Sequence, residues 1–445
     1  MSALFKDSTL SLIGRVVMLG AAMFISASIS RTLGASLQGT YNVFVLIVNT
    51  ASTIFSFSAS VASIVLGARD PESLPKLLGN ALLMAAGLGT LAFVTVLLLF
   101  QVPSIQGYLQ ENGVDGLLVA GILLMLPVTM LTTFLREIIR GAGQITRYNV
   151  LMVMPYLLNL ILLMAAFILQ PGMVAGAVAA WVAAQAITML VIAYLAWQAA
   201  GFRIGLDLKL MRFSLGYGAR NHLGLVAQLL NYRLDVFLIG VFLPTEYIGY
   251  YTISTLYAER IWEFPTAIRT ALLYHASAAK STDAPQITAQ TTRVAMVFVT
   301  LTTAGLAVVA YPFIILVHGP TFQPAVLPLI ILMPGVWMLS LGKLLGVYLA
   351  SINRPEIGSY AGLISLVFTL VLDLWLIPQL GITGAALASS VSYTVSTLVI
   401  TGYFLRVTGL TWLDVSVIRR SDLYLLRRAV IRMVRPGARA SESEI

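Results

Sequence analysis

Two opposite charges lie close together in the apolar stretch NYRLDVFLIG, which runs from Asn231 to Gly240. Arg233 and Asp235 are two residues apart, so on a helix their side chains point roughly 200° away from each other and cannot neutralise one another. A guanidinium in such a place is suited to bind a phosphate, because its planar fork donates two parallel hydrogen bonds. Each charge therefore needs its own partner or its own access to water.

Other charged residues interrupt apolar stretches in the same way. A charge at the bilayer centre costs about 2.5–3.5 kcal/mol on insertion scales, so several are tolerated only around a water-filled or paired interior. The excess of cations predicts an interior suited to an anion. For the three cations near the ends of their stretches, at positions 31, 220 and 269, snorkelling to the membrane surface is the alternative. The whole set is Arg15, Arg31, Arg220, Arg233, Arg260, Arg269, Lys343, Asp235, Glu259, Glu263 and Asp373.

The segments that carry these charges have the length and composition of membrane spans. The 445 residues are 59% hydrophobic and 10% charged, with a mean hydropathy of +0.91. The apolar runs are about twenty residues long, which crosses the hydrocarbon core as a helix, and they lack the short alternating segments of a membrane barrel. We predict an all-α polytopic membrane protein with spans at 9–32, 40–66, 77–100, 114–136, 148–169, 172–197, 213–240, 246–274, 293–316, 324–351, 357–378 and 381–405.

Basic residues orient these twelve predicted transmembrane helices. Lys and Arg occur in the N-terminal segment and in every second connection, and they are missing from the six connections between, such as 101–113 and 170–172. By the positive-inside rule, both termini are predicted to be cytoplasmic in the cell inner membrane. The residues counted are Lys6, Arg69, Lys76, Arg136, Arg140, Arg147, Arg203, Lys209, Arg212, Lys280, Arg293 and Arg354.

The sequence also contains signs of an internal repeat. LGASLQGTYNVF (33–44) resembles LPTEYIGYYTIS (243–254), and PGMVAGAVAA (171–180) resembles LGITGAALAS (380–389) at nearly the same offset. Chance similarity between apolar segments is the alternative. We interpret the matches as a parallel repeat of two six-helix lobes, 1–200 and 201–408, with a central cavity between them.

The repeat makes spans 1 and 2 equivalent to spans 7 and 8, and these four spans are predicted to line the cavity. The substrate-binding cations are then Arg15, Arg31, Arg233, Arg260, Arg269 and Lys343, and the polar lining is Asn49, Thr53, Ser56 and Ser60. The acids Asp235, Glu259, Glu263 and Asp373 are assigned either to ion coupling or to structural ion pairs. A buried ion-pair network without any ligand is the alternative for the whole set.

Catalysis and cofactor binding find no support in the sequence. There is no cysteine, and the histidines His222, His275 and His318 are scattered, so we expect no metal and no cofactor. No catalytic motif occurs, and the outer connections are too short for a folded domain, so an enzyme is not expected. Residues 409–435 are predicted to form a basic amphipathic helix on the anionic inner leaflet, followed by a disordered tail, 436–445. Nucleic acid is not an expected partner, because the basic residues follow the topology.

Three segments in order resemble a known family: LGASLQGTY after span 1, RLDVFLIGVFLPTEYIGYY across spans 7 and 8, and YLASINRP followed by IPQLGITGAALASSVSY near the end. They are similar to the polysaccharide (O-antigen-type) flippases of the multidrug/oligosaccharidyl-lipid/polysaccharide exporter superfamily. The resemblance implies that a polyprenyl-diphosphate-linked oligosaccharide moves from the cytoplasmic to the outer leaflet by alternating access through a cationic cavity. Partners implied are membrane lipids and polysaccharide-assembly proteins.

Two other functions stay open at this point. The same scaffold serves drug/cation antiporters, although these use acidic cavity residues, and the chain could instead be a membrane enzyme or scaffold of polysaccharide assembly. The chain also lacks the two additional C-terminal spans typical of the peptidoglycan-precursor branch, which argues against that substrate.

Overall fold

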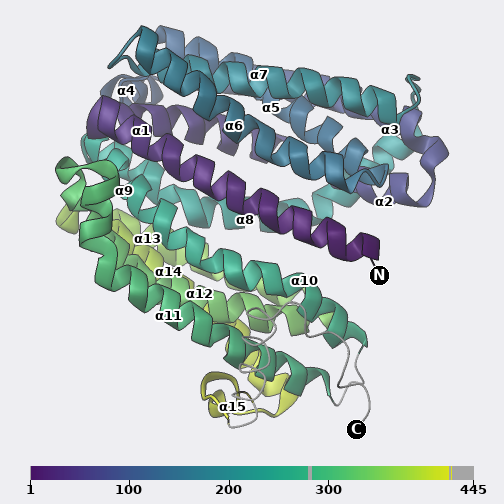
Figure 1. Ribbon diagram of the computed structural model, residues 1–445, viewed down its shortest axis with the longest axis vertical. Helices are drawn as coiled ribbons and strands as arrows, with labels where there is room; N and C mark the ends of the chain where they lie inside the picture. The colour runs from purple at the N-terminus through teal and green to yellow at the C-terminus, as the bar shows by residue number, and fades with distance from the viewer. Residues whose placement is uncertain (1, 279–282, 420–421, 423–445) are drawn as a thin grey trace. The chain divides into compact units, whose positions relative to one another are not determined.

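The computed structural model describes residues 2–278, 283–419 and 422, and the described part is helical throughout (Figure 1). The helices group into two compact units, one within Met1–Ile253 and Phe313–Ala325, the other within Ser254–Pro312 and Val326–Ile445. The first unit contains α1 (Ser2–Phe55), α2 (Val61–Arg69), η1 (Pro71–Ser73), α3 (Leu74–Leu99), α4 (Pro103–Glu111), α5 (Gly116–Gly141), α6 (Ile145–Leu169), α7 (Val174–Ala199), α8 (Leu208–Phe242), the start of α9 (Thr245–Ala258) and η3 (Pro320–Ala325). The second contains η2 (Glu259–Trp262), α10 (Glu263–Ala278), most of α11 (Ala284–His318), α12 (Val326–Ser351), α13 (Glu356–Leu380), α14 (Ile382–Thr408) and α15 (Trp412–Ser416).

Ten helices in the described part are long and apolar enough to cross a membrane, and no strand occurs there. The all-α membrane class is thus confirmed, while the number twelve stays a prediction. The difference has two local causes. Helix α1 runs through the predicted span 9–32 and on into the predicted span 40–66 as far as Phe55, with a kink at Gly34, whose φ of 75° favours glycine. The predicted span 246–274 is divided into α9, η2 and α10.

The division of 246–274 follows from Pro265. Proline lacks a backbone N–H, and its ring clashes with the carbonyl four residues earlier, here that of Ile261. The 3-10 segment Glu259–Trp262 lies directly before this proline, and neither α9, with 14 residues, nor α10, with 16 residues, is long enough to span alone. The 3-10 segment carries Glu259 and Arg260, and Glu263 follows it as the first residue of α10.

The predicted span 40–66 is interrupted as well. α1 ends at Phe55 and α2 begins at Val61, with positive φ angles at Phe57 (48°) and Ser58 (50°) between them. Helix α8 holds this break. His222 Nε2 lies 2.8 Å from the Ile54 carbonyl oxygen, and Nδ1 lies 3.1 Å from Ser58 Oγ. A Cβ on Gly218 would overlap the backbone of Phe57 and Ser58, so glycine permits the close approach. The prediction of one continuous helix over 40–66 was wrong at this point.

A reciprocal contact joins α1 and α9 within the first unit. A Cβ on Gly39 would overlap the backbone of Thr245, and a Cβ on Gly249 would overlap the backbone of Ala35. Asn42 Nδ2 donates to Thr252 Oγ1 at 2.6 Å, and these two residues are 210 apart, the same offset that relates residues 39 and 249. Paired contacts of this kind are the mark of two-fold symmetry.

Helix α8 belongs to the first unit by its contacts, because it packs against α1, α2 and α3. The contact units therefore do not end at residue 200. The predicted lobes 1–200 and 201–408 are halves of an internal repeat. The two compact units do not test this repeat, so the lobes stay a prediction.

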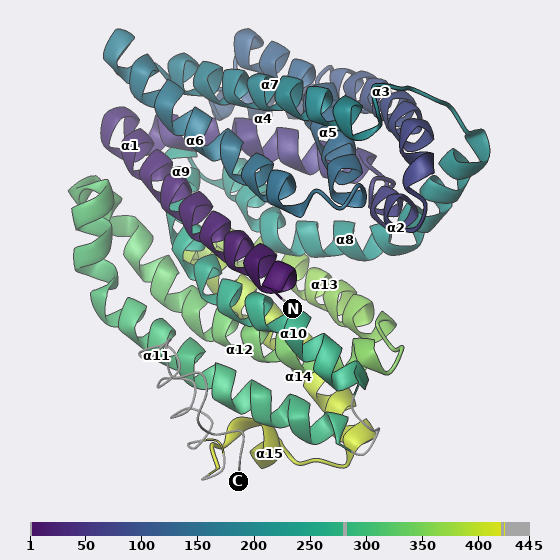
Figure 2. The same ribbon diagram turned by 45° about the vertical axis from the view of Figure 1, so that its right-hand side comes forward.

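The chain after α14 folds back onto the start of α11 in the second unit (Figures 1 and 2). Gly409 ends α14 in the left-handed conformation, with φ 70°, and Thr411 and Asp414 form a capping box that starts α15. Of the predicted surface helix 409–435, residues 412–416 are helical, whereas 420–421, 423–435 and the predicted disordered tail 436–445 lie outside the described residues.

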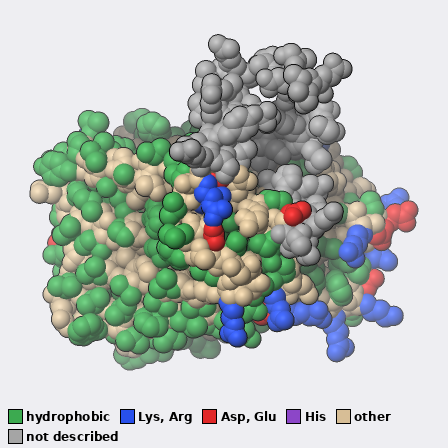
Figure 3. Space-filling view, turned by 90° about the horizontal axis from the view of Figure 1, so that it is seen from below, with side chains coloured by type: hydrophobic (Ala, Val, Ile, Leu, Met, Phe, Trp, Pro, Cys, Tyr) green, Lys and Arg blue, Asp and Glu red, His purple; other side chains and the backbone are tan. Residues whose placement is uncertain are grey.

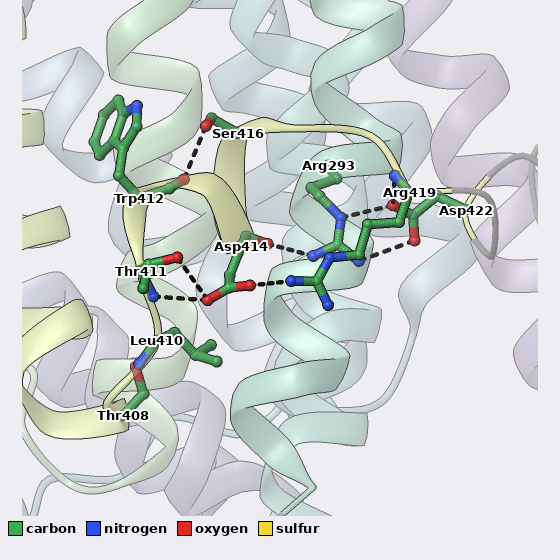
Figure 4. Close-up of polar contacts among 9 residues, drawn as sticks. All are labelled: Arg293, Thr408, Leu410, Thr411, Trp412, Asp414, Ser416, Arg419 and Asp422. Atoms are coloured by element: carbon green, nitrogen blue, oxygen red, sulfur yellow. Dashed lines mark hydrogen bonds and ion pairs between the residues drawn. The ribbon is translucent and has the colours of Figure 1, made fainter.

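Arg293 anchors this segment, as Figure 4 shows. Its Nε lies 2.6 Å from Asp422 Oδ2 and its Nη2 lies 3.0 Å from Asp422 Oδ1, while Nη1 donates to the Asp414 carbonyl oxygen. Arg293 is 4% exposed and Asp422 is fully buried, so the pair is shielded from water. The hydrogen bonds from Arg293 hold the pKa of the Asp422 carboxyl below its usual range.

We expect Asp422→Ala to destabilise the protein by about 3–5 kcal/mol, because it leaves the Arg293 cation buried without its partner. Thermal unfolding in detergent measures this, with Glu356→Ala as the control, since Glu356 pairs with Arg354 at an exposed site.

The pH dependence of the anchor follows from the lowered pKa of Asp422. Such a carboxyl stabilises the folded protein fully above the ordinary aspartate pKa of about 3.9, and this stabilisation is lost as the pH falls through the pKa of the folded state. The anchor should thus be insensitive to pH between about 5 and 8, and an Asp422→Asn protein should lose part of the acid sensitivity. A melting temperature unchanged by Asp422→Ala would contradict the anchor.

The surface agrees with a membrane environment. Hydrophobic side chains are widespread on the face seen in Figure 3, and Lys and Arg appear in the middle and at the right of that view but not at its left. Many large apolar side chains are exposed, among them Ile168 (82%), Leu169 (80%) and Val308 (82%). Single exposed apolar residues are ordinary on a soluble protein, but so many of them on helices of membrane-spanning length agree with a surface that faces hydrocarbon.

Candidate functional site

The opening pair of charges lies on α8, with Arg233 half-buried and Asp235 fully buried. Asp235 accepts a hydrogen bond from the hydroxyl of Tyr251 on α9 and another from the backbone N–H of Val236 at 2.7 Å. Arg233 donates to the Tyr232 carbonyl oxygen at 3.0 Å. Asp235 therefore joins two neighbouring helices, as a structural role requires, and Arg233 projects from another side of α8.

A second charged cluster forms in the second unit around the break before Pro265. Lys343 Nζ on α12 lies 4.0 Å from the ring centre of Trp262 in η2, which is within cation–π distance. Glu259, Glu263 and Arg269 act electrostatically on Lys343. The break thus brings acids, a cation and an aromatic ring together, with Lys343, Glu259 and Glu263 half-buried.

Arg260 lies in the same 3-10 segment and is also half-buried, whereas Arg269, on α10, is exposed. Arg15 and Arg31, both on α1, are exposed as well. The predicted cations therefore divide between the two units, with Arg15, Arg31 and Arg233 in the first and Arg260, Arg269 and Lys343 in the second.

Arg31 has a specific partner that its sequence position did not reveal. Its Nε donates to the Val317 carbonyl oxygen at 2.8 Å, and Nη2 donates to that of Leu316. These carbonyls end α11, where a cation stabilises the helix dipole and satisfies free acceptors. The neighbouring Ser30 hydroxyl lies 2.7 Å from His318 Nδ1 in a buried contact. The observed contacts of Arg31 thus favour a structural role over ligand binding.

The predicted polar lining is only partly one helical face. Thr53 Oγ1 donates to the Asn49 carbonyl oxygen at 2.8 Å, and Ser56 Oγ donates to the Thr53 carbonyl oxygen at 2.8 Å. Asn49 is exposed, but Ser56 and Ser60 belong to the interruption between α1 and α2, where Ser60 is buried. Serine hydroxyls compete for backbone groups in this way and weaken a helix.

Asp373 on α13 is fully buried, and Thr369 and Ser365, one and two turns earlier, are fully buried too. Ser365 donates to the Ser392 carbonyl oxygen on α14 at 2.9 Å. A polar stripe thus runs along α13 where it packs on α14, and the acid of this stripe stays a candidate for ion coupling.

Sequence reasoning missed Asn112, which links three segments through its side chain and its backbone oxygen. Its Nδ2 donates to the Gly240 carbonyl oxygen at 3.0 Å, its Oδ1 accepts from Thr245 at 3.2 Å, and its backbone oxygen accepts from Thr40 at 2.9 Å. An asparagine after a short helix does not by itself indicate a residue that links segments, because its burial and its neighbours are known only from the structure. His222 was likewise set aside, because a single histidine does not point to a helix break in another segment.

The fold is that of a superfamily of membrane transporters. An inward-facing multidrug resistance MATE family transporter of the MOP superfamily matches 90% of this chain and 98% of its own, with a TM-score of 0.69 at 15% identity. The lipid II flippase MurJ in an inward closed conformation matches 97% of this chain and 96% of its own, with a TM-score of 0.69 at 15% identity. A MOP superfamily transporter from Pyrococcus furiosus, described as having a binding pocket of reversed polarity, matches 92% and 95%, with a TM-score of 0.63 at 19% identity.

The chain belongs to the polysaccharide biosynthesis protein family, whose model matches residues 39–327. The chain is also 28% identical over 168 residues to the "Probable low-salt glycan biosynthesis flippase Agl15" of Haloferax volcanii. That match spans 37% of this chain and 36% of the relative, well under two thirds of its length. The proteins named here are described as transporters or flippases, in agreement with the prediction that the chain is not an enzyme.

Proposed function

We propose that this protein is a flippase that moves a polyprenyl-diphosphate-linked oligosaccharide from the cytoplasmic to the outer leaflet of the cell inner membrane. The observation that carries the proposal is a set of half-buried cations in a chain of the polysaccharide biosynthesis protein family: Arg233 and Lys343 on helices of membrane-spanning length, and Arg260 in the 3-10 break before Pro265. Guanidinium groups suit a diphosphate, because they bind its oxygens in a bidentate manner. The cavity predicted between two six-helix lobes would hold this head group.

Transport by alternating access needs two related halves that exchange contacts. The reciprocal contact of α1 with α9 supports the repeat at offset 210. With the proposed cytoplasmic termini, this contact would lie near the outer surface. Its glycines allow the two backbones to touch, so it is suited to close that side against water and ions. The lipid-linked oligosaccharide is the proposed substrate, and the basic C-terminal segment is proposed to bind anionic lipids of the inner leaflet.

A drug/cation antiporter is the second candidate, and one observation favours it. Asp373 is fully buried among hydroxyl-bearing residues, as an acid that binds a cation would be. The multidrug transporter fold is compatible with either function. In the flippase, Asp373 would serve ion coupling instead of substrate binding.

Reconstituted vesicles distinguish the two functions. A fluorescent polyprenyl-diphosphate oligosaccharide is placed in the inner leaflet of the vesicles, and an impermeant quencher is added outside. The lipid should reach the outer leaflet and be quenched faster in vesicles with the purified protein than in protein-free vesicles. A lipophilic fluorescent cation, tested in the same vesicles with an imposed ion gradient, should not accumulate. Accumulation of the cation without movement of the lipid would replace the flippase by the antiporter.

A further inference from the structure

A large cavity lies within the first unit, between α1, α3, α4 and α8. Its volume is about 740 Å³, within the range of about 300–1,000 Å³ typical of small-molecule sites. The walls on the three long helices are apolar except for Thr50 and include Ile47, Ile54, Leu99, Phe237 and Val241. These wall residues lie on helices with the length and hydropathy of membrane spans, so hydrocarbon is the medium that reaches the cavity.

The polar lining groups gather mainly at one end. Ser104, Tyr108 and Glu111 all belong to α4, the short helix that covers this end. Glu111 is the one charged residue in the described lining, and its carboxylate repels a phosphate. The cavity is therefore suited to a hydrocarbon chain and not to the anionic head group.

The cavity is close to the proposed head-group site along α8. Arg233 precedes Phe237 by four residues, one turn or about 6 Å along the helix. On α1 the lining extends from Ile47 to Phe55, eight residues or about 12 Å, and ends where the helix breaks. A lipid whose phosphate is bound by Arg233 could thus place the adjoining part of its chain here.

We propose that this cavity binds the part of the polyprenyl chain next to the diphosphate while the substrate is being moved. The inference rests on the proposed function and adds a specificity site for the lipid, separate from the site for the sugar. Its occupant is the substrate's own isoprenoid chain, and an acyl chain of a membrane phospholipid is the competing outcome.

Gly107 provides a way to fill the cavity without disturbing the fold. It lies on α4 in the lining, its φ is not positive, and a Cβ there meets nothing within 4 Å. Gly107→Phe adds a ring to the cavity. Gly87→Phe on α3 is the matched control, because a Cβ at Gly87 also meets nothing within 4 Å and Gly87 is not in the lining.

Vesicle transport should be compared for the polyprenyl substrate and for an analogue with the same head group and chain length, in which the two isoprene units next to the diphosphate are replaced by an ethylene-glycol linker. The original protein should prefer the all-isoprenoid chain, and Gly107→Phe should remove roughly ten-fold of that preference, the loss expected when about two methylene-sized contacts are displaced. Gly87→Phe should keep the preference. If the original protein moves neither lipid, the proposed function fails. If it moves both and Gly107→Phe behaves like Gly87→Phe, the function stands and the cavity inference is overturned.

Photocrosslinking identifies the occupant. A photoreactive amino acid replaces Leu99, which lines the cavity and is 45% exposed, or Leu91, which lies on the same helix outside the lining and is 47% exposed. Two vesicle samples are prepared, one with tritiated prenyl lipid and one with tritiated phospholipid. Position 99 should capture the prenyl lipid several-fold better than position 91 does. Equal capture of phospholipid and prenyl lipid at position 99 would show an ordinary lipid-filled groove and overturn the proposal.

Discussion

The double variant Asn42→Cys/Thr252→Cys is expected to lose nearly all transport when its two thiols are joined, and to regain it on reduction. The side chains of Asn42 and Thr252 touch in this conformation, with 2.6 Å between Nδ2 and Oγ1. The chain has no cysteine of its own, so the introduced thiols have no competing partner. Joining them with an oxidant or a short bis-thiol reagent fixes α1 to α9.

The large effect follows from where the pair lies in the reciprocal contact. Gly39 touches the backbone of Thr245 and Gly249 touches that of Ala35, so helices α1 and α9 must separate before anything passes between them. A covalent bond between residues 42 and 252, three residues beyond each glycine, prevents that separation, while the conformation open on the opposite side stays accessible. The transport cycle should stop, and substrate binding from the cytoplasmic side should persist.

The single variants Asn42→Cys and Thr252→Cys are the controls, and each should transport under the same oxidising conditions. Transport is measured in vesicles before oxidation, after it and after reduction, with the cross-linked fraction followed by mass spectrometry. Undiminished transport by a fully cross-linked protein would mean that this contact stays closed throughout the cycle. The two helices would then act as a fixed joint and not as a gate.

Arg233→Ala and Arg260→Ala are each expected to lower transport by roughly 10- to 100-fold at normal protein abundance. This range corresponds to the loss of hydrogen bonds to a charged group, about 1.5–3 kcal/mol. Arg→Lys at either position should recover part of the activity, because lysine keeps the charge but loses the bidentate geometry. The measurement is the vesicle assay with the prenyl-diphosphate oligosaccharide, beside thermal unfolding of the same samples.

Two further variants separate ligand binding from structure. Arg354→Ala is the matched control, because Arg354 is an exposed cation paired with Glu356, and it should transport normally. Asp235→Ala should instead lower stability, because it leaves the Tyr251 hydroxyl buried without its acceptor. If Arg233→Ala and Arg260→Ala both transport normally at normal abundance, these cations are structural.

The candidate site was partly visible in the sequence and partly not. A charged residue within a long apolar run is conspicuous by itself, so Arg233, Lys343 and Asp373 could be selected without a structure. Their partners could not, because Trp262 beside Lys343 and Tyr251 beside Asp235 are ordinary aromatic residues in apolar surroundings. Arg31 shows the limit most clearly, since it was assigned to the substrate from its position alone, and only the structure shows that it binds the carbonyl oxygens of Leu316 and Val317.

The sequence by itself determined the membrane class, the approximate ends of most spans and several helix ends, because the bilayer and the local backbone impose these. A run of about twenty apolar residues must form a helix to satisfy its backbone in hydrocarbon, and Asp115 and Asp207 cap their helices through neighbouring N–H groups. Only the tertiary structure decided where span 2 is broken, which helix His222 supports, how Asn112 joins three segments and what Arg293 binds. Each of these depends on groups tens to hundreds of residues apart in the chain, and their energies arise only when packing brings them within a few ångströms of each other.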